Sequence, residues 1–195
     1  MLGKAAVAMW WDVAPEVRDE WEEWHTCEHM PERLGIPGFL RGSRWTDGNG
    51  AYFVLYETAD ASVLTGSAYL ERLNNPTPWS RRMMPHHRNM VRSLCLVRCG
   101  YGEGVPGVLA TLRFAEAAPE LPRRRGVTSA HFLEAQPMTG APTAEQQIRG
   151  GDATADKIIL LGGYGSKAVV AAARELAISD AKFGLYQVGY SLARS

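Results

Sequence analysis

The chain has 195 residues, and its 21 Lys and Arg balance 21 Asp and Glu, so the formal net charge at pH 7 is zero. Hydrophobic residues make up 46% and charged residues 22%, which excludes a chain disordered throughout and suffices for one ordinary domain or two small ones. A neutral chain also lacks the overall positive charge that is typical of nucleic-acid binders.

In the first hundred residues the pattern of apolar residues predicts four strands and two helices. The first helix begins near Pro15, which suits a first helical turn, and ends before Gly35. The Asp-Gly-Asn-Gly sequence at residues 47–50 predicts a hairpin turn. We expect strands at 4–13, 39–46, 51–57 and 88–99, a second helix at 60–73, and a short helical or irregular segment at 79–87.

A weaker version of the same order follows in the second half. A degenerate first-helix segment is expected at 119–126 and a long polar insertion at 137–156. Strands are expected at 108–114, 127–136, 157–164 and 183–192, with an Ala-rich helix at 166–178.

The order β-α-β-β-α-β is that of a ferredoxin-like unit. We therefore predict an α+β protein with two tandem ferredoxin-like units, which form a dimeric α/β-barrel-type arrangement in one chain. The domains are a site-bearing unit at 1–100, a glycine-rich linker at 101–107 and a degenerate unit at 108–195 that covers the first sheet. Such a chain is a monomeric pseudo-dimer, or it forms a homodimer through an exposed edge strand.

The apolar runs are far shorter than the ~20 residues of a membrane-spanning helix. No signal peptide is evident, and the three cysteines form no paired set. These features predict a cytoplasmic protein without membrane or nucleic-acid partners.

Residues that usually build sites are concentrated in the first half. All six Trp lie between Trp10 and Trp79, and four of the five His lie between His25 and His87. The functional site is therefore expected in the first unit.

The densest group of such residues lies on the first predicted helix. His25 and His29 are spaced i, i+4 and share one helix face, as do Glu28 and Glu32. An imidazole next to a carboxylate is a common general base, because the carboxylate orients the ring and stabilises its protonated form. Residues 25–29 also match the H-x-x-E-H string of some zinc enzymes, so a metal site is an alternative. A partly exposed His-Glu helix face without function is another.

A second cluster lies at residues 79–88 and contains Trp79, Arg81 and His86. Arginine suits a carboxylate ligand, and tryptophan supplies an apolar wall. The alternative is that these arginines pair with the acidic residues of the first helix. Trp10 and Trp11 should point to opposite faces of the first strand, with core packing or pocket lining as the two roles open to each.

The segment at residues 28–33 (EHMPER), followed by 36–39 (IPGF), resembles the dimeric α/β-barrel superfamily of ferredoxin-like proteins, and its EthD-like branch in particular. Tyr69-Leu70 and the loop at 77–79 are also similar to that branch. The resemblance covers roughly residues 5–99. It implies the fold, with a pocket between helices and sheet, and places His29 and Glu32 in the family string. The second half carries no equivalent of this segment.

Together these features predict a cofactor-independent enzyme, a lyase or isomerase, that moves a proton at carbon in a small aromatic or cyclic organic acid. Isomerisation, cyclisation, dehydration and decarboxylation all remain open as its reaction. His29 is expected to be the acid or base, Glu32 or Glu28 its orienting group, and His25 an assistant. The substrate-binding residues are expected to be Trp10, Arg44, Tyr69, Trp79, Arg81 and His86. Alternatives are a non-catalytic ligand-binding or stress-associated protein and a metalloenzyme that uses His25 and His29.

Overall fold

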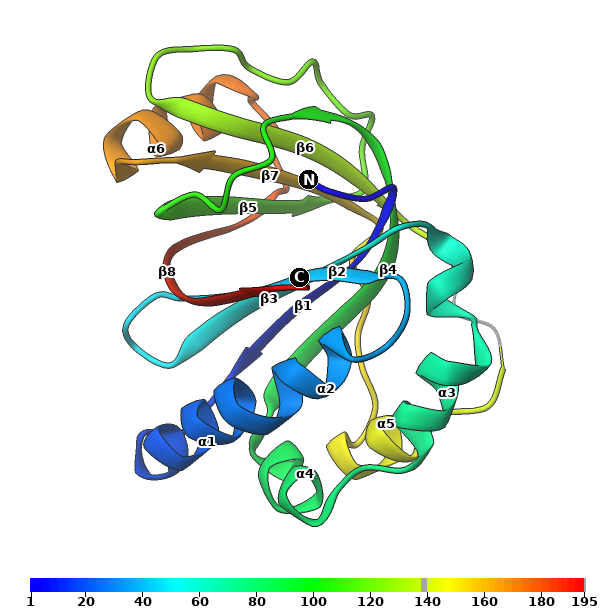
Figure 1. Ribbon diagram of the computed structural model, residues 1–195. Helices are drawn as coiled ribbons and strands as arrows, with labels where there is room; N and C mark the ends of the chain where they lie inside the picture. The colour runs from blue at the N-terminus through cyan, green and yellow to red at the C-terminus, as the bar shows by residue number, and fades with distance from the viewer. Residues whose placement is uncertain (138–139, 195) are drawn as a thin grey trace.

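The structure is a computed structural model that describes residues 1–137 and 140–194 (Figure 1). The strands found there are β1 Ala5–Asp12, β2 Phe39–Thr46, β3 Ala51–Thr58, β4 Arg88–Tyr101, β5 Val108–Phe114, β6 Val127–Ala135, β7 Lys157–Gly163 and β8 Lys182–Ala193. The α-helices are α1 Arg18–Trp24, α2 Met30–Leu34, α3 Ser67–Asn74, α4 Pro78–Met83, α5 Ala144–Arg149 and α6 Ser166–Glu175. A π-helical segment, His25–His29, joins α1 to α2, and short 3-10 helices lie at Pro15–Val17, Ala61–Leu64 and Met84–His86.

The eight strands form one closed antiparallel barrel in the order β1-β3-β2-β8-β5-β7-β6-β4, with β4 pairing back to β1. Two pairings join the halves of the chain: Arg41 to Thr46 of β2 pair with β8, and Cys95 to Tyr101 of β4 pair with β6. Every strand therefore has a hydrogen-bonded neighbour on both sides, and no open sheet edge remains.

This barrel contradicts the predicted fold class of two tandem ferredoxin-like units. Strands of both halves are hydrogen-bonded into one sheet, and the second half does not have the order β-α-β-β-α-β. The helix expected at 119–126 does not form: Pro119 and Pro122 disfavour a helix there, and the connection from β5 to β6 is irregular. Helix α5 instead follows β6, inside the predicted insertion at 137–156, of which residues 138 and 139 lie outside the described part of the chain.

Individual strands of the first half lie close to their predicted ranges. In β1, alternate side chains point into two different hydrophobic cores, one on each face of the sheet. Val7, Met9 and Trp11 face outward into a core under the helices, whereas Ala8 and Trp10 face the barrel interior. The prediction that Trp10 and Trp11 point to opposite faces is confirmed.

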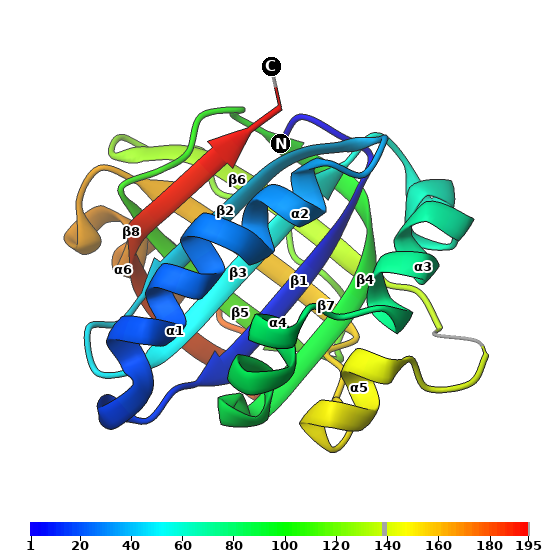
Figure 2. The same cartoon turned by 60° about the horizontal axis from the view of Figure 1, so that its bottom comes forward.

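Helices cover two opposite sides of the barrel. Helices α1, α2, α4 and α5 lie on one side, and α6 packs on β5, β6 and β7 on the other (Figure 1). Figure 2 shows α1 and α2 crossing the outer face of the strands of the first half. Among the described residues, no helix has both the length and the apolar character needed to cross a membrane.

Candidate functional site

A buried cavity lies between these helices and the outer face of the first-half strands. It leaves about 20 Å³ for the centre of a water-sized sphere, which is room for roughly one water molecule. Its walls combine apolar and ionisable side chains from β1, β3, β4, the π segment, α2, α3, α5 and the turn at residues 84–87. They are Met9, Trp11, His25, His29, Arg33, Tyr56, Tyr69, Leu73, Met84, His87, Met90, Arg92, Glu145 and Arg149.

The π-helical segment places two imidazoles in this cavity. The backbone N–H of Met30 donates to the carbonyl of His25, which is the i to i+5 pattern of a π turn. The rings of His25 and His29 lie with their centroids 5.4 Å apart, and the two residues are only 1% and 7% exposed. Single π turns occur often at functional sites.

His25 is oriented by a cation on its far side. Its Nδ1 lies 3.4 Å from Nη1 of Arg44, which also donates to the carbonyl of Glu22. The ring stacks on Trp21 with centroids 5.0 Å apart. Because a guanidinium has no acceptor, Nδ1 of His25 faces it with a lone pair, and Nε2 carries the hydrogen.

His87 is a third imidazole in the same cavity. The indole Nε1 of Trp21 donates to His87 Nε2 at 2.8 Å, and the His87 ring stacks on Trp11 at 4.7 Å between centroids. An indole N–H only donates, so Nε2 of His87 is the acceptor and the hydrogen lies on Nδ1.

His29 has no hydrogen-bond partner among the described residues. Its Nδ1 is buried and unpartnered, and its ring lies 4.6 Å from that of Trp24. No hydrogen bond from a described neighbour fixes which ring nitrogen of His29 carries the hydrogen. Of the three imidazoles, only that of His29 can therefore adopt either tautomer.

All three imidazoles are held in the neutral form. Burial lowers the pKa of His25, His29 and His87 well below the ordinary value of 6.5, and nearby positive charges lower it further. Arg44 contributes most among these charges at His25, Arg33 at His29 and Arg149 at His87. Neutral imidazole is the form that can accept a proton.

The charged groups of the cavity wall are mostly arginines. Arg33, Arg92 and Arg149 line it together with one carboxylate, Glu145. Arg33 pairs with Glu145 and has Glu32 4.0 Å from its Nη1, and Arg149 contacts Asp152 at 2.9 Å and Glu145 at 3.6 Å. Guanidinium groups in the wall suit an anionic guest.

Unpartnered polar atoms are concentrated here. Nine buried side-chain nitrogen and oxygen atoms lack a hydrogen-bond partner among the described residues, and six of them belong to residues that line this cavity. Native proteins leave few such atoms, and each one needs a reason. The six are Trp11 Nε1, His25 Nε2, His29 Nδ1, Arg33 Nη1, Tyr56 Oη and His87 Nδ1.

Of the predicted site residues, His25, His29 and Tyr69 line the cavity, and Tyr69 accepts a hydrogen bond from Arg92 at 2.9 Å. Arg44 does not line the cavity but contacts Nδ1 of His25. Glu28 instead accepts from Thr77 at 2.6 Å and from Trp24 at 3.2 Å, which anchors the start of α4.

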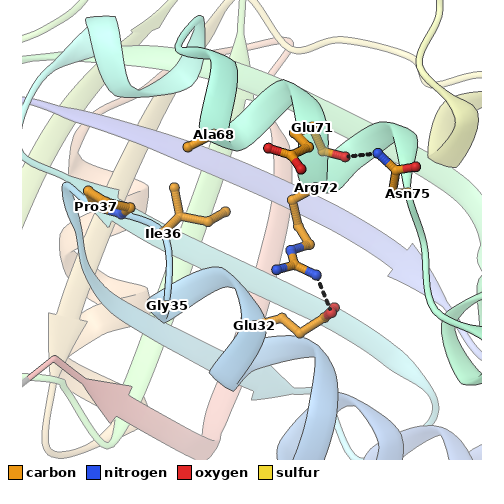
Figure 3. A pocket seen from close by; sticks show the side chains of 8 residues that line it. All are labelled: Glu32, Gly35, Ile36, Pro37, Ala68, Glu71, Arg72 and Asn75. Atoms are coloured by element: carbon orange, nitrogen blue, oxygen red, sulfur yellow. Dashed lines mark hydrogen bonds and ion pairs between the residues drawn. The ribbon is translucent and has the colours of Figure 1, made fainter.

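Glu32 lies outside the cavity, in an open groove of about 330 Å³ between α2 and α3, where it pairs with Arg72 at 3.0 Å (Figure 3). Trp10 is inside the barrel, where it donates to Thr111 at 3.2 Å. Trp79, Arg81 and His86 are not among the cavity-lining residues, and Arg81 is exposed.

Sequence reasoning missed several residues of the cavity, among them His87, Tyr56 and Glu145. His87 is adjacent to His86, and only the turn at Met84–His86 determines which of the two points inward. Glu145 follows the capping residue Thr143, a helix start that the sequence signals, but its pairing with Arg33 spans 112 residues. Among residues 1–137 and 140–194, no group of three His, Cys, Asp or Glu is placed to hold a metal ion.

No protein-family model matches the sequence, and neither does any curated protein. Solved structures do match. An anthrone oxidase-like protein has a TM-score of 0.58 at 12% identity, over 97% of this chain and 93% of that one. A candidate monooxygenase from Fusobacterium nucleatum subsp. nucleatum has a TM-score of 0.57 at 9% identity, over 100% and 97%. Another from Lactobacillus acidophilus has 0.52 at 7% identity, over 97% and 96%. At these identities the similarities show the fold alone, a closed antiparallel barrel covered by helices, and they do not confirm the EthD-like assignment.

Proposed function

We propose that the protein is a cofactor-independent enzyme that removes a proton from carbon in a small aromatic or cyclic organic acid, with His29 as the base. The observation that carries this proposal is the group of three neutral imidazoles in one buried cavity, of which only that of His29 has no hydrogen-bond partner in the described part of the chain. A general base must be neutral and within reach of the substrate, and His29 meets the first condition by burial.

The charge of the cavity supports an acid as substrate. Arg33 keeps Nη1 free of hydrogen bonds, and its partner Glu145 engages the other terminal nitrogen. A carboxylate or other anion in the cavity would find this N–H among the guanidinium groups of the wall. It would also raise the basicity of His29, because a nearby negative charge favours the protonated imidazole.

The names of the structural neighbours are compatible with this chemistry. They describe an oxidase-like protein and candidate monooxygenases. Proton removal gives an electron-rich carbanion, a form in which a carbon acid can react with dioxygen. Oxygen-dependent conversion is therefore a second outcome of the same first step.

An aromatic acid is larger than the free space in the cavity, so part of its wall must move to admit one. Helix α5 is the wall element that we expect to move. It has six residues, and its polar contacts to the rest of the wall include the pairing of Glu145 with Arg33 and a hydrogen bond from Ala144 N–H to Asn74 at 3.1 Å.

The test is a panel of small phenolic, aromatic and cyclic acids incubated with the protein in air and followed by proton NMR. We expect conversion of at least one compound, with a rate that falls about 10²- to 10⁴-fold in His29→Gln. His131→Gln is the matched control, because His131 is equally buried but lies on β6, away from the cavity. A ligand recovered unchanged would favour a binding protein, and full activity of His29→Gln would contradict the proposal.

A further inference from the structure

Two of the three imidazoles in the cavity have their hydrogen placed by a neighbour. Trp21 lies on α1, and its indole N–H donates to Nε2 of His87 at 2.8 Å. This bond persists only while Nε2 is unprotonated, so the hydrogen of neutral His87 is on Nδ1. Nδ1 is buried and has no acceptor among the described residues.

The ring of His87 is also held in place. It stacks on Trp11 with an interplanar angle of 29° and meets Trp21 edge-on at 69°. The backbone N–H of His87 donates to Met84 at 3.1 Å. The stacking and the bond from Trp21 fix the ring, and the backbone bond fixes the residue that carries it, so Nδ1–H cannot turn away to find another partner.

His25 repeats the arrangement with a different neighbour. The Arg44 guanidinium stays protonated and lies 3.4 Å from Nδ1, so Nε2 bears the hydrogen. Nε2 is buried and unpartnered as well. Trp21, which fixes His87 through its N–H, stacks on His25 at 5.0 Å, so one indole organises both rings.

Arg33 adds a third donor. Its Nη1 is buried without a hydrogen bond, with Glu32 Oε2 4.0 Å away, and Arg33 lines the same cavity. These three N–H groups belong to residues that line a space of about one water molecule, and each lacks a hydrogen-bond acceptor among the described residues. Buried donors without acceptors are costly unless a ligand supplies the acceptor, and the ligand that three N–H groups favour is an anionic oxygen.

We infer that His87 and His25, held as donors by Trp21 and Arg44, together with Arg33 stabilise an oxyanion that forms on the substrate. The inference rests on the proposed function and narrows its substrate class to carbon acids whose negative charge passes to oxygen, that is, compounds with an enolisable ketone. In the step, the C–H bond breaks and its proton goes to the lone pair of His29. The electron pair left on carbon forms a C=C bond, and the adjacent C=O becomes C–O⁻, which accepts the N–H donors.

The tautomers are measured directly by long-range proton–nitrogen NMR of ¹⁵N-labelled protein at pH 7.5. We expect His87 with its hydrogen on Nδ1 and His25 with its hydrogen on Nε2. In Trp21→Phe the preference of His87 should be lost. Trp24→Phe is the matched control, because Trp24 is equally buried on α1 but donates to Glu28. The opposite tautomer of His87 in the unmodified protein would overturn the inference, even if Trp21→Phe does not fold.

The oxyanion is probed with p-nitrophenol, whose phenolate differs in colour from the neutral phenol. At a pH equal to the pKa of the free phenol, bound p-nitrophenol should be mostly phenolate, and Trp21→Phe should bind it at least about tenfold more weakly than Trp24→Phe. No binding, or preferential binding of the neutral phenol, would overturn the inference. Phenolate binding without conversion of any carbon acid would uphold the donor set and refute the proposed function.

Discussion

Burial of three neutral imidazoles makes the stability of the fold depend on pH. At each of His25, His29 and His87 burial disfavours the charged form and lowers the pKa in the folded state. The unfolded chain, with ordinary histidines, therefore binds more protons below pH 6.5 than the folded one. The contribution of these groups is fully present above that pH and is lost as pH falls below it.

We expect the free energy of unfolding to fall between pH 6.5 and 5 by up to about 1.4 kcal/mol per pH unit for each buried histidine. Urea titrations at several pH values measure this slope. His29→Gln should have a shallower slope, whereas His86→Gln should keep it because His86 is partly exposed. Equal slopes in all three proteins would contradict a buried, neutral His29.

The helical region that carries His25 and His29 could be predicted from sequence, because its start at Pro15, its apolar spacing and its end at Gly35 are all local signals. The pairing of each imidazole could not. Trp21 is 66 residues from His87 and Arg44 is 19 from His25, so only the folded barrel determines which nitrogen receives a donor. The prediction that Glu28 or Glu32 orients His29 was unreliable for the same reason. Glu28 and Glu32 share its helix but bond to Thr77 and Arg72.

At the scale of elements, α5 joins the two halves of the chain at the cavity. Its Glu145 and Arg149 are both buried, and Glu145 faces Arg33 of α2. Removing one charge from a buried pair leaves the other uncompensated, which is far more costly than breaking a pair in water.

Glu145→Gln should lower the free energy of unfolding by about 3–5 kcal/mol in denaturant titrations. The matched control is Glu175→Gln, which breaks the pair with Arg124 on the surface, where Glu175 is 59% exposed; it should cost less than about 1 kcal/mol. Hydrogen exchange of the α5 amides should also rise in the first variant. Equal losses of stability in the two variants would contradict a buried ion pair between Glu145 of α5 and Arg33.

Strands were easier to predict than helices in the second half. The largely apolar runs of β5 and β7 are local signals, and both strands lie within the predicted ranges. The expected helix at 119–126 rested only on the order of the first half, and Pro119 and Pro122 act against it. Helix α5 was missed because a six-residue helix gives too short a periodic pattern.

At the scale of the whole molecule, barrel closure ties the halves together. The pairings of β2 with β8 and of β4 with β6 join residues far apart in the sequence, so no local sequence pattern predicts them. The sequence indicated two sheets that cover each other, whereas the strands continue into one sheet around a shared interior. That interior contains Trp10 and Phe53 from the first half and Leu133 and Ile158 from the second.

A shared interior and these two strand pairings predict one cooperative unfolding transition. The tryptophans provide a convenient probe, because all six lie between residues 10 and 79 and report on the first half, whereas circular dichroism reports on strands of both halves. The two signals should give the same midpoint in urea. Separate midpoints would show that the halves fold as independent domains.

We propose isotope exchange without oxygen as the most direct test of whether His29 removes a proton from carbon in the cavity lined by His25, His29 and His87. Enolisable cyclic ketones and phenolic acids are incubated with the protein in D₂O under anaerobic conditions, and deuterium in their C–H positions is followed by NMR. We expect enzyme-dependent exchange into at least one compound, retained in His131→Gln and reduced about 10²- to 10⁴-fold in His29→Gln. Exchange that is as fast in His29→Gln as in the unmodified protein would contradict that expectation.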